Sequence, residues 1–397
     1  MVYVRKRVYV LLIHACILVS HKKKTMRIAL IILIGIHGII HLFGFFKAFG
    51  IFEFNAISQP ISKTSGIIWL LTFGLLITTI VLLIVQSKYW WFTGIIAVIL
   101  SQILIINFWS DAKFGTILNL LILLSTIIGY STFSFKNTIR VERTKMFDNF
   151  KIINKNIHSE QMLSGLPIIV QKWLHNSGAI GIKPIYTVYL EQELQMLMNP
   201  EQKDWMNAQA TQYFTTEPPA FNWSVNLKMN SFLDVVGRDK FENGKGEMTI
   251  KLFSLFSIAN AKNNDKVNQA ALQRFLAETC WFPSATLSSY IKWEYIDDYS
   301  AKANIEYNRT KGSGIFHFDE NGNFKKFVAM RFKDAMDAEP TEWTVTAIKN
   351  EIRNGIMVPI ECEVNWKLKD SNWTWLKLKI TDIKYNIQKI QMAEVID

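Results

Sequence analysis

The sequence predicts two parts of different class: an α-helical membrane bundle of about four spans, and then an α+β domain. In the second part a large antiparallel sheet curls into a half-barrel with a covering helix. Two observations predict this division. Long uncharged apolar stretches occupy the first third of the chain, whereas short stretches of alternating apolar and polar residues dominate the rest. The predicted parts are an N-terminal extension at 1–25, a four-span transmembrane region at 26–135, a basic juxtamembrane linker at 136–160 and a β-rich globular domain at 161–390.

The four apolar stretches are long enough to cross a membrane. At about 1.5 Å per residue, a helix of about 20 residues covers the hydrocarbon core of about 30 Å. The expected spans are residues 28–46, 66–85, 89–109 and 114–133. Aromatic residues at both ends of the third stretch fit the membrane interface.

The extension before these spans has its own short apolar stretch, at residues 8–19. This stretch is too short to span, and the lysines that follow it at 22–24 are a poor context for signal-peptide cleavage. We therefore expect Met26 to be the natural start of the chain.

Basic residues flank the spans unequally, which predicts their orientation. Most lie before the first span, at Lys88 and just after the fourth span, and these sides are expected to face the cytoplasm. The expected location is the cell (inner) membrane, crossed several times, with the globular domain in the cytoplasm. A miscounted or re-entrant span would invert this orientation.

The formal net charge of +11 fits a chain that meets anionic lipid. No basic stripe with interleaved aromatics or helix-turn-helix pattern favours nucleic acid. The basic linker at 136–160 either lies against lipid headgroups or only sets the topology. Three widely spaced cysteines indicate neither a disulfide framework nor a zinc site, and no metal or other cofactor is expected.

The β-rich domain begins with two expected short helices, at 162–178 and 199–214, the second opened by Asn199 and Pro200. Strands are expected at 221–229, 234–241 and 246–253, with Asn243 and Gly244 in a hairpin turn between the last two. Helical periodicity returns around 264–287, and strands then continue to about residue 385.

Several phrases resemble a bacterial family of membrane-attached proteins whose domain has no known function. They are LPIIVQKWLHNSG, WMNAQATQYF, GRDKFENGKGEM, LQRFLAETCWFPSAT, WEYIDDYSAKA and ITDIKYN, and they cover most of residues 162–387. More distantly, FHFDENGNF and VPIECEVNW resemble lipoprotein-carrier half-barrels of bacterial envelopes. The resemblance implies a carrier-like sheet but no reaction, and because such carriers work outside the cytoplasm, it leaves the side of the domain open.

One candidate polar site lies in the membrane region. His37 and His41 are four residues apart and share a helix face, and Asp111 and Lys113 are expected at the same membrane face. Histidines in hydrocarbon suggest a metal, quinone or proton-handling site. The alternative is interhelical hydrogen bonding that holds the bundle together.

A second candidate site is an apolar hollow between the sheet and the helix at 267–280. Its expected wall is Leu272, Phe275, Leu276 and Trp281, with Arg238 to meet an acidic headgroup. A cross-strand salt bridge is the alternative for Arg238. The domain is also rich in tryptophan, which lines a pocket or fills a core equally well: Trp205, Trp223, Trp281, Trp293, Trp343, Trp366, Trp373 and Trp375.

The sequence lacks a P-loop, a dinucleotide fingerprint and the common hydrolase motifs. This absence favours a binding or carrier protein over an enzyme. The leading hypothesis is a membrane-anchored module for a lipophilic or amphipathic ligand. Membrane lipid, such a ligand or an envelope protein partner are the expected partners. The alternatives are a membrane enzyme or redox component that uses His37 and His41, and a purely structural partner of an envelope protein.

Overall fold

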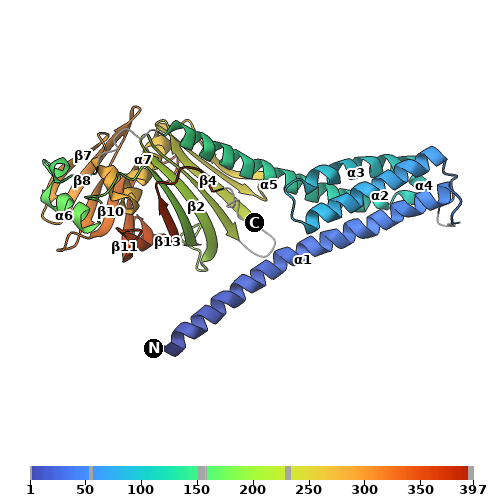
Figure 1. Ribbon diagram of the computed structural model, residues 1–397, viewed down its shortest axis with the longest axis horizontal. Coiled ribbons are helices and arrows are strands. Elements are labelled where there is room, and N and C mark those ends of the chain that lie inside the picture. Colours follow the sequence, from blue (N-terminus) through green and yellow to red (C-terminus); the bar gives the residue numbers. More distant parts are fainter. Residues whose placement is uncertain (1, 53–56, 151–156, 158, 229–233, 392–397) are drawn as a thin grey trace. The chain divides into compact units, whose positions relative to one another are not determined.

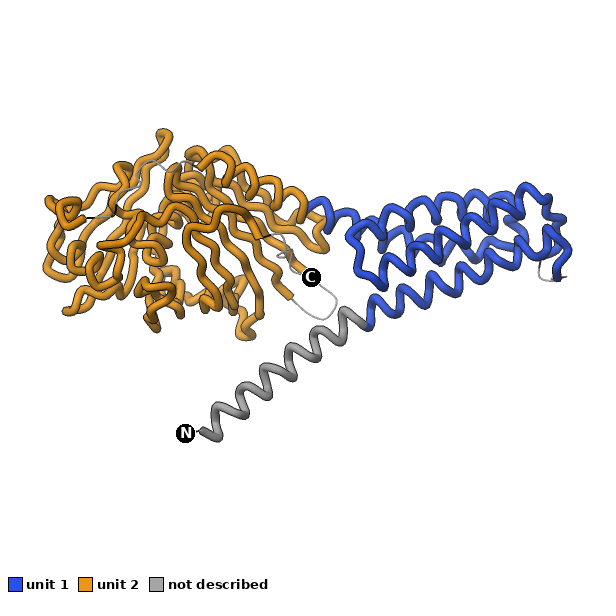
Figure 2. Tube along the Cα trace, viewed as in Figure 1, with its two compact units in different colours: residues 1–135 blue, residues 136–397 orange. Residues whose placement is uncertain are grey.

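The computed structural model describes residues 2–52, 57–150, 157, 159–228 and 234–391, with the backbone alone for residues 2–24. The chain forms two compact units, residues 1–135 (unit 1) and residues 136–397 (unit 2), which Figure 2 colours separately. The predicted N-terminal extension falls almost entirely on residues whose side chains lie outside this description.

Unit 1 contains the four predicted apolar helices. Its elements are α1 (Val2–Ala48), α2 (Lys63–Ile84), α3 (Trp90–Asn107), the short α4 (Trp109–Ala112) and the first part of α5 (Gly115–Asn149). Four helical segments are long and apolar enough to cross a membrane: Thr25–Ala48, Lys63–Ile84, Trp90–Asn107 and Gly115–Asn149. The prediction of about four such helices is confirmed.

The exposed side chains of the unit 1 helices are mostly apolar, and several buried ones are polar. Large aliphatic side chains point outward, such as Leu71 at 57% exposure and Leu120 at 65%. Polar side chains point inward, and the buried hydroxyls of Thr72 and Thr79 donate to backbone carbonyls one turn earlier. Exposed aliphatic side chains together with buried polar ones reverse the pattern of a helix in water.

Unit 2 is built on one antiparallel sheet of 13 strands (Figure 1). The strand order is β6-β5-β4-β3-β2-β1-β13-β12-β11-β10-β9-β8-β7, so two meanders join where β1 pairs with β13. The first wing is β1 (Thr187–Met196), β2 (Met206–Thr216), β3 (Pro219–Lys228), β4 (Asp234–Glu242), β5 (Lys245–Leu252) and β6 (Phe256–Ala261). The second wing is β7 (Ile291–Asp297), β8 (Ser300–Tyr307), β9 (Thr310–Phe318), β10 (Phe324–Arg331), β11 (Thr341–Arg353), β12 (Ile356–Lys367) and β13 (Asn372–Tyr385).

The sheet curls around α7 (Asp265–Glu278), which begins where the Asn264 side chain accepts from two backbone N–H groups. This helix packs against β3–β5 of one wing and β8–β10 of the other. The two wings also meet at their hairpins, where Thr310 Oγ1 donates to the carbonyl of Gly244 at 2.7 Å. The predicted half-barrel with a covering helix is confirmed.

Four short helical elements complete unit 2 among the residues that the structure describes. Three of them are α6 (Ile168–Asn176), which ends before the left-handed Gly178, and the 3₁₀ turns η2 (Thr279–Trp281) and η3 (Pro283–Leu287) that follow α7. A further 3₁₀ turn, η1 (Glu160–Leu163), precedes α6. The Asn243–Gly244 turn has positive φ at both residues, as the predicted tight hairpin requires.

The predicted helix at 199–214 is wrong, because most of that segment is strand β2. Asn199 and Pro200 begin only a turn, and from Met206 alternate residues face the core. Ala208 and Ala210 of this strand are buried, at 6% and 2% exposure. Strands β1 and β6 lie in segments for which no strand was predicted.

Candidate functional site

The strand register of unit 2 separates two faces of the sheet. On β4, Asp239 and Phe241 point to the concave face with α7, whereas Arg238 and Lys240 point to the convex face. The same alternation places Ala329 and Arg331 of β10 on the concave face. A candidate site therefore has to be built separately for each face.

A buried ion-pair network crosses the concave face. Arg274 of α7 donates to Asp239 at 2.6 Å and to Glu278 at 2.8 Å. Glu278 also accepts from the Gln212 amide at 2.8 Å. Burial raises the pKa of Glu278, and the positive charge of Arg274 opposes that rise. The two acidic side chains of this network are thus already occupied by Arg274.

Arg331 is the second cation of the concave face and is held differently. Its guanidinium carbon lies 4.7 Å from the ring centre of Trp343 and 5.7 Å from that of Trp366, and its Nε donates to the Ala270 carbonyl at 2.9 Å. Burial lowers the pKa of Arg331 to about 10, although part of the side chain reaches solvent. Within the described part of the chain, no carboxylate lies within ion-pair distance of it.

Tryptophans from adjacent strands surround Arg331. Trp343, Trp366 and Trp373 are direct neighbours across β11, β12 and β13, and with Arg331 we call them the tryptophan end. The indole N–H groups of Trp343, Trp373 and the nearby Trp375 are buried and have no acceptor among the described residues. Buried donors are almost always paired, so these indole N–H groups are candidates for contact with an acceptor from outside the chain.

The predicted apolar wall lies in the core of the same face. Leu272, Phe275 and Leu276 are 0% exposed and Trp281 is 2% exposed. They pack in the main apolar cluster, where the Phe275 ring meets those of Phe214 and Phe282. A small cavity of about 10 Å³ lies elsewhere, beside Trp173 and Asn350, and has room for about one water molecule.

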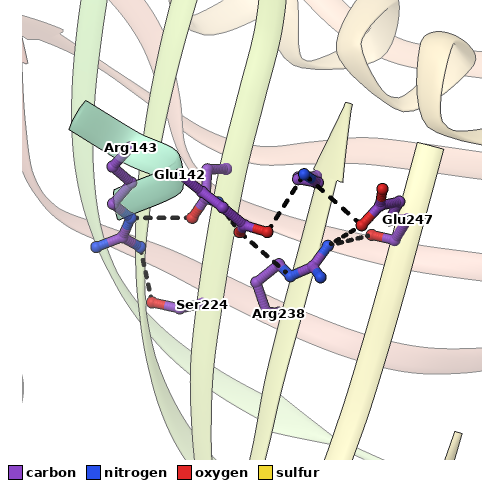
Figure 3. Close-up of polar contacts among 7 residues, drawn as sticks. Glu142, Arg143, Ser224, Arg238 and Glu247 are labelled. Atoms are coloured by element: carbon purple, nitrogen blue, oxygen red, sulfur yellow. Dashed lines mark hydrogen bonds and ion pairs between the residues drawn. The ribbon is translucent and has the colours of Figure 1, made fainter. Parts of the chain in front are cut away.

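Arg238, the predicted headgroup contact, lies on the convex face, away from those four residues. Figure 3 shows it between Glu142 and Glu247. Its guanidinium pairs with Glu142 of α5 at 3.4 Å and with Glu247 of β5 at 3.0 Å. Lys240 bridges the same two carboxylates at 3.2 and 3.6 Å. The contact with Glu247 is a cross-strand salt bridge, which was the alternative interpretation of Arg238 from the sequence.

The neighbouring Arg143 fixes the end of α5 to the convex face. It donates to Asn222 Oδ1 at 3.0 Å, to Thr211 at the carbonyl and hydroxyl, and to Ser224 Oγ at 2.7 Å. The Tyr213 ring lies 4.6 Å below its guanidinium carbon. Residues 136–149, predicted as the start of a linker, thus form a helix whose buried face belongs to unit 2.

In unit 1, His37 and His41 are both 1% exposed. His37 Nε2 lies 2.8 Å from Asn119 Oδ1 and 3.0 Å from Ser101 Oγ, and His41 Nδ1 donates to the His37 carbonyl at 2.9 Å. The His37 contacts join α1 to α3 and α5 and are interhelical hydrogen bonds of the kind given as the alternative, whereas the His41 contact lies within α1. His37 Nδ1 and His41 Nε2 have no partner among the described residues, and a redox or metal role for the pair stays a prediction.

Asp111 and Lys113 have contacts of their own. Asp111 accepts from the Ser58 hydroxyl and from the backbone N–H groups of Ser58 and Gln59, and these hydrogen bonds lower its pKa. Lys113 lies over the Phe114 ring at 5.5 Å. The described residues contain no group of three or more histidine, cysteine or acidic side chains placed to hold a metal ion.

Comparison with known proteins assigns the chain to a family. A family profile described as a family of unknown function (DUF6920) matches residues 164–385. The chain belongs to this family. The matched range contains most of the phrases that carry the resemblance noted from the sequence. Because the family has no known function, the match assigns no reaction.

No curated protein matches the chain. Among solved structures, the β-rich unit is similar to a LolA superfamily protein from Nitrosomonas europaea, at 11% identity and a TM-score of 0.27, over 55% of this chain and 94% of that one. It is also similar to a β-barrel-like protein of a domain of unknown function (DUF1849) from Brucella abortus, at 11% identity and a TM-score of 0.21, over 51% of this chain and 98% of that one.

Proposed function

We propose that unit 2 binds a lipophilic or amphipathic ligand at the tryptophan end of its concave face. The unpaired indole N–H groups of Trp343 and Trp373 carry this proposal, because a ligand acceptor would remove the cost of burying them without a partner. Apolar side chains at the same ends of the neighbouring strands would contact the acyl part. These are Leu194 and Met196 of β1, Met206 and Ala208 of β2, and Leu376 of β13.

The helices of unit 1 would anchor this binding module in a membrane. Their outward aliphatic side chains and inward polar side chains suit lipid on all sides. The four anchors would also keep the module beside a supply of lipid, so the proposed ligand class and the anchor support each other. No covalent chemistry is part of the proposal.

Photo-cross-linking of the purified full-length chain tests this function. A phosphatidylcholine with a diazirine in its acyl chain is expected to label peptides from β1–β2 and β11–β13 as well as the apolar helices. The hairpin of β7 and β8 is an internal control, since Tyr295 and Tyr299 there are 63% and 56% exposed and would report nonspecific labelling. Labelling confined to the apolar helices, or equal to that of this control, would rule out the proposed function.

We also propose that unit 2 lies in the cytoplasm, because Lys136, Arg140, Arg143 and Lys145 directly follow the last apolar stretch. A reporter that is active only in the cytoplasm is expected to be active when fused after Asp397. The same reporter fused after Ala112, in the loop expected on the other side, should be silent. If a reporter that is active only in the periplasm is active when fused after Asp397, this orientation is wrong.

A further inference from the structure

Arg331 differs from Arg274 and Arg238 in how its charge is balanced. Arg274 has two carboxylates within 2.8 Å, and Arg238 has two within 3.4 Å. Arg331 has a backbone carbonyl and two aromatic faces instead. Of its five N–H donors, the described contacts use only the one on Nε, which leaves the forked end of the guanidinium for another acceptor.

The surroundings of Arg331 offer no acidic side chain to fill that place. Asp239 and Glu278 lie close enough to raise its pKa in part, but each pairs with Arg274 through one carboxylate oxygen, and the other oxygen of Glu278 accepts from Gln212. Lys333 adds a second cation, with its Nζ 6.0 Å from the ring centre of Trp366. The nearby Asp337 carboxylate accepts from the backbone N–H groups of Lys333 and Asp334.

Stacking fixes the direction of the Arg331 fork. A guanidinium held over aromatic rings loses little freedom when it binds, and its planar geometry matches two oxygens of a phosphate or carboxylate. Two cations at one end of an apolar face are complementary to a lipid with an acidic headgroup. The acyl chains would contact the apolar strands, and the headgroup would contact the two cations.

We propose that the tryptophan end selects an anionic phospholipid, whose phosphate is bound by Arg331 with help from Lys333. This inference rests on the proposed function and specifies its ligand. A phospholipid is the fitting source of the phosphate, since the apolar strand ends would take its acyl chains and the helices of unit 1 suit a bilayer.

The test compares two diazirine-labelled lipids on the full-length chain, phosphatidylglycerol and phosphatidylcholine. In the wild-type protein, unit 2 peptides are expected to be labelled about tenfold more by phosphatidylglycerol at equal concentration, a ratio that corresponds to about 1.4 kcal/mol. In Arg331→Gln the ratio is expected to fall to about one, whereas labelling by phosphatidylcholine should stay unchanged. Arg331→Lys keeps the charge without the fork and should retain part of the preference.

Lys326→Gln is the matched control, because Lys326 lies on the same strand, is exposed and faces the convex side. It removes one positive charge from unit 2 and should leave the ratio at its wild-type value. Equal labelling by both lipids in wild type, or an equal loss of preference in Arg331→Gln and Lys326→Gln, would overturn the inference. In the first of these outcomes specific labelling of unit 2 would still support the proposed function, whereas absence of label from unit 2 with both lipids would reject that function itself.

Discussion

Replacing Phe275 with alanine is expected to lower the free energy of unfolding by about 3–5 kcal/mol. The side chain is 0% exposed, and its ring lies 5.8 Å from that of Phe282, 6.3 Å from that of Phe214 and 6.5 Å from that of Tyr290. Truncation would leave a cavity between α7 and the sheet that this ring network cannot close without moving several large side chains. Denaturant unfolding of the full-length chain in detergent, followed by near-ultraviolet circular dichroism, measures the loss.

Phe256→Ala is the control for this change, since Phe256 lies on edge strand β6 and is 60% exposed. It is expected to change the free energy of unfolding by no more than about 0.5 kcal/mol. A loss below about 1 kcal/mol in Phe275→Ala, together with loss of bound lipid, would show that Phe275 lines a ligand pocket. The expected result instead identifies Leu272, Phe275, Leu276 and Trp281 as the core on which the tryptophan end rests.

Local signals explain why much of the fold could be predicted from the sequence. Uncharged apolar stretches of about 20 residues indicate helices that can cross a membrane. Asn243–Gly244 favours a tight hairpin, and Asn264 caps the start of α7. Strand β2 was mistaken for a helix because Ala208, Ala210 and their polar neighbours satisfy both periods locally. Only pairing with β1 and β3, which is distant information, decides in favour of a strand.

The choice between Arg238 and Arg331 shows the corresponding limit for the candidate site. An arginine beside a predicted hairpin is visible in the sequence, but the face it occupies depends on the register. The alternation of side chains along β10 is enough to place Arg331 on the same face as the buried Phe327 and Ala329. Nothing local shows that Trp343 and Trp366 lie beside it, because they come from two later strands. The tryptophans were noted from the sequence, but their arrangement was not.

The end of α5 shows the same limit at a domain boundary. The basic, polar composition of residues 136–160 predicts a linker, yet Ile139, Arg143, Met146 and Phe147 recur at helical spacing and are buried. The buried face of this helix was not recognised because it includes Arg143, and an arginine is usually exposed to solvent. Its hydrogen-bond partners Asn222, Thr211 and Ser224 are distant in sequence.

Replacing Arg143 with alanine is therefore expected to cost about 3 kcal/mol, through loss of its charge-assisted hydrogen bonds and of its contact with the Tyr213 ring. The change would leave Asn222 Oδ1 and the Thr211 carbonyl with fewer donors beneath a helix that still covers them. Arg143→Lys keeps the charge but cannot reach all the acceptors, so its loss should be intermediate. Chemical denaturation and hydrogen exchange of β2 and β3 amides in the full-length chain measure both effects.

Arg140→Ala is the matched control on the same helix, because Arg140 is exposed and donates to Asn137 one turn away. Its expected effect is about 0.5 kcal/mol or less. Equal losses in Arg143→Ala and Arg140→Ala would mean that residues 136–149 only connect the units. A large loss confined to Arg143→Ala would mean that the folded β-rich unit begins at the end of the last apolar stretch. A fragment that starts at residue 161 would then lack part of its own structure and expose the convex surface around Arg238 and Tyr213.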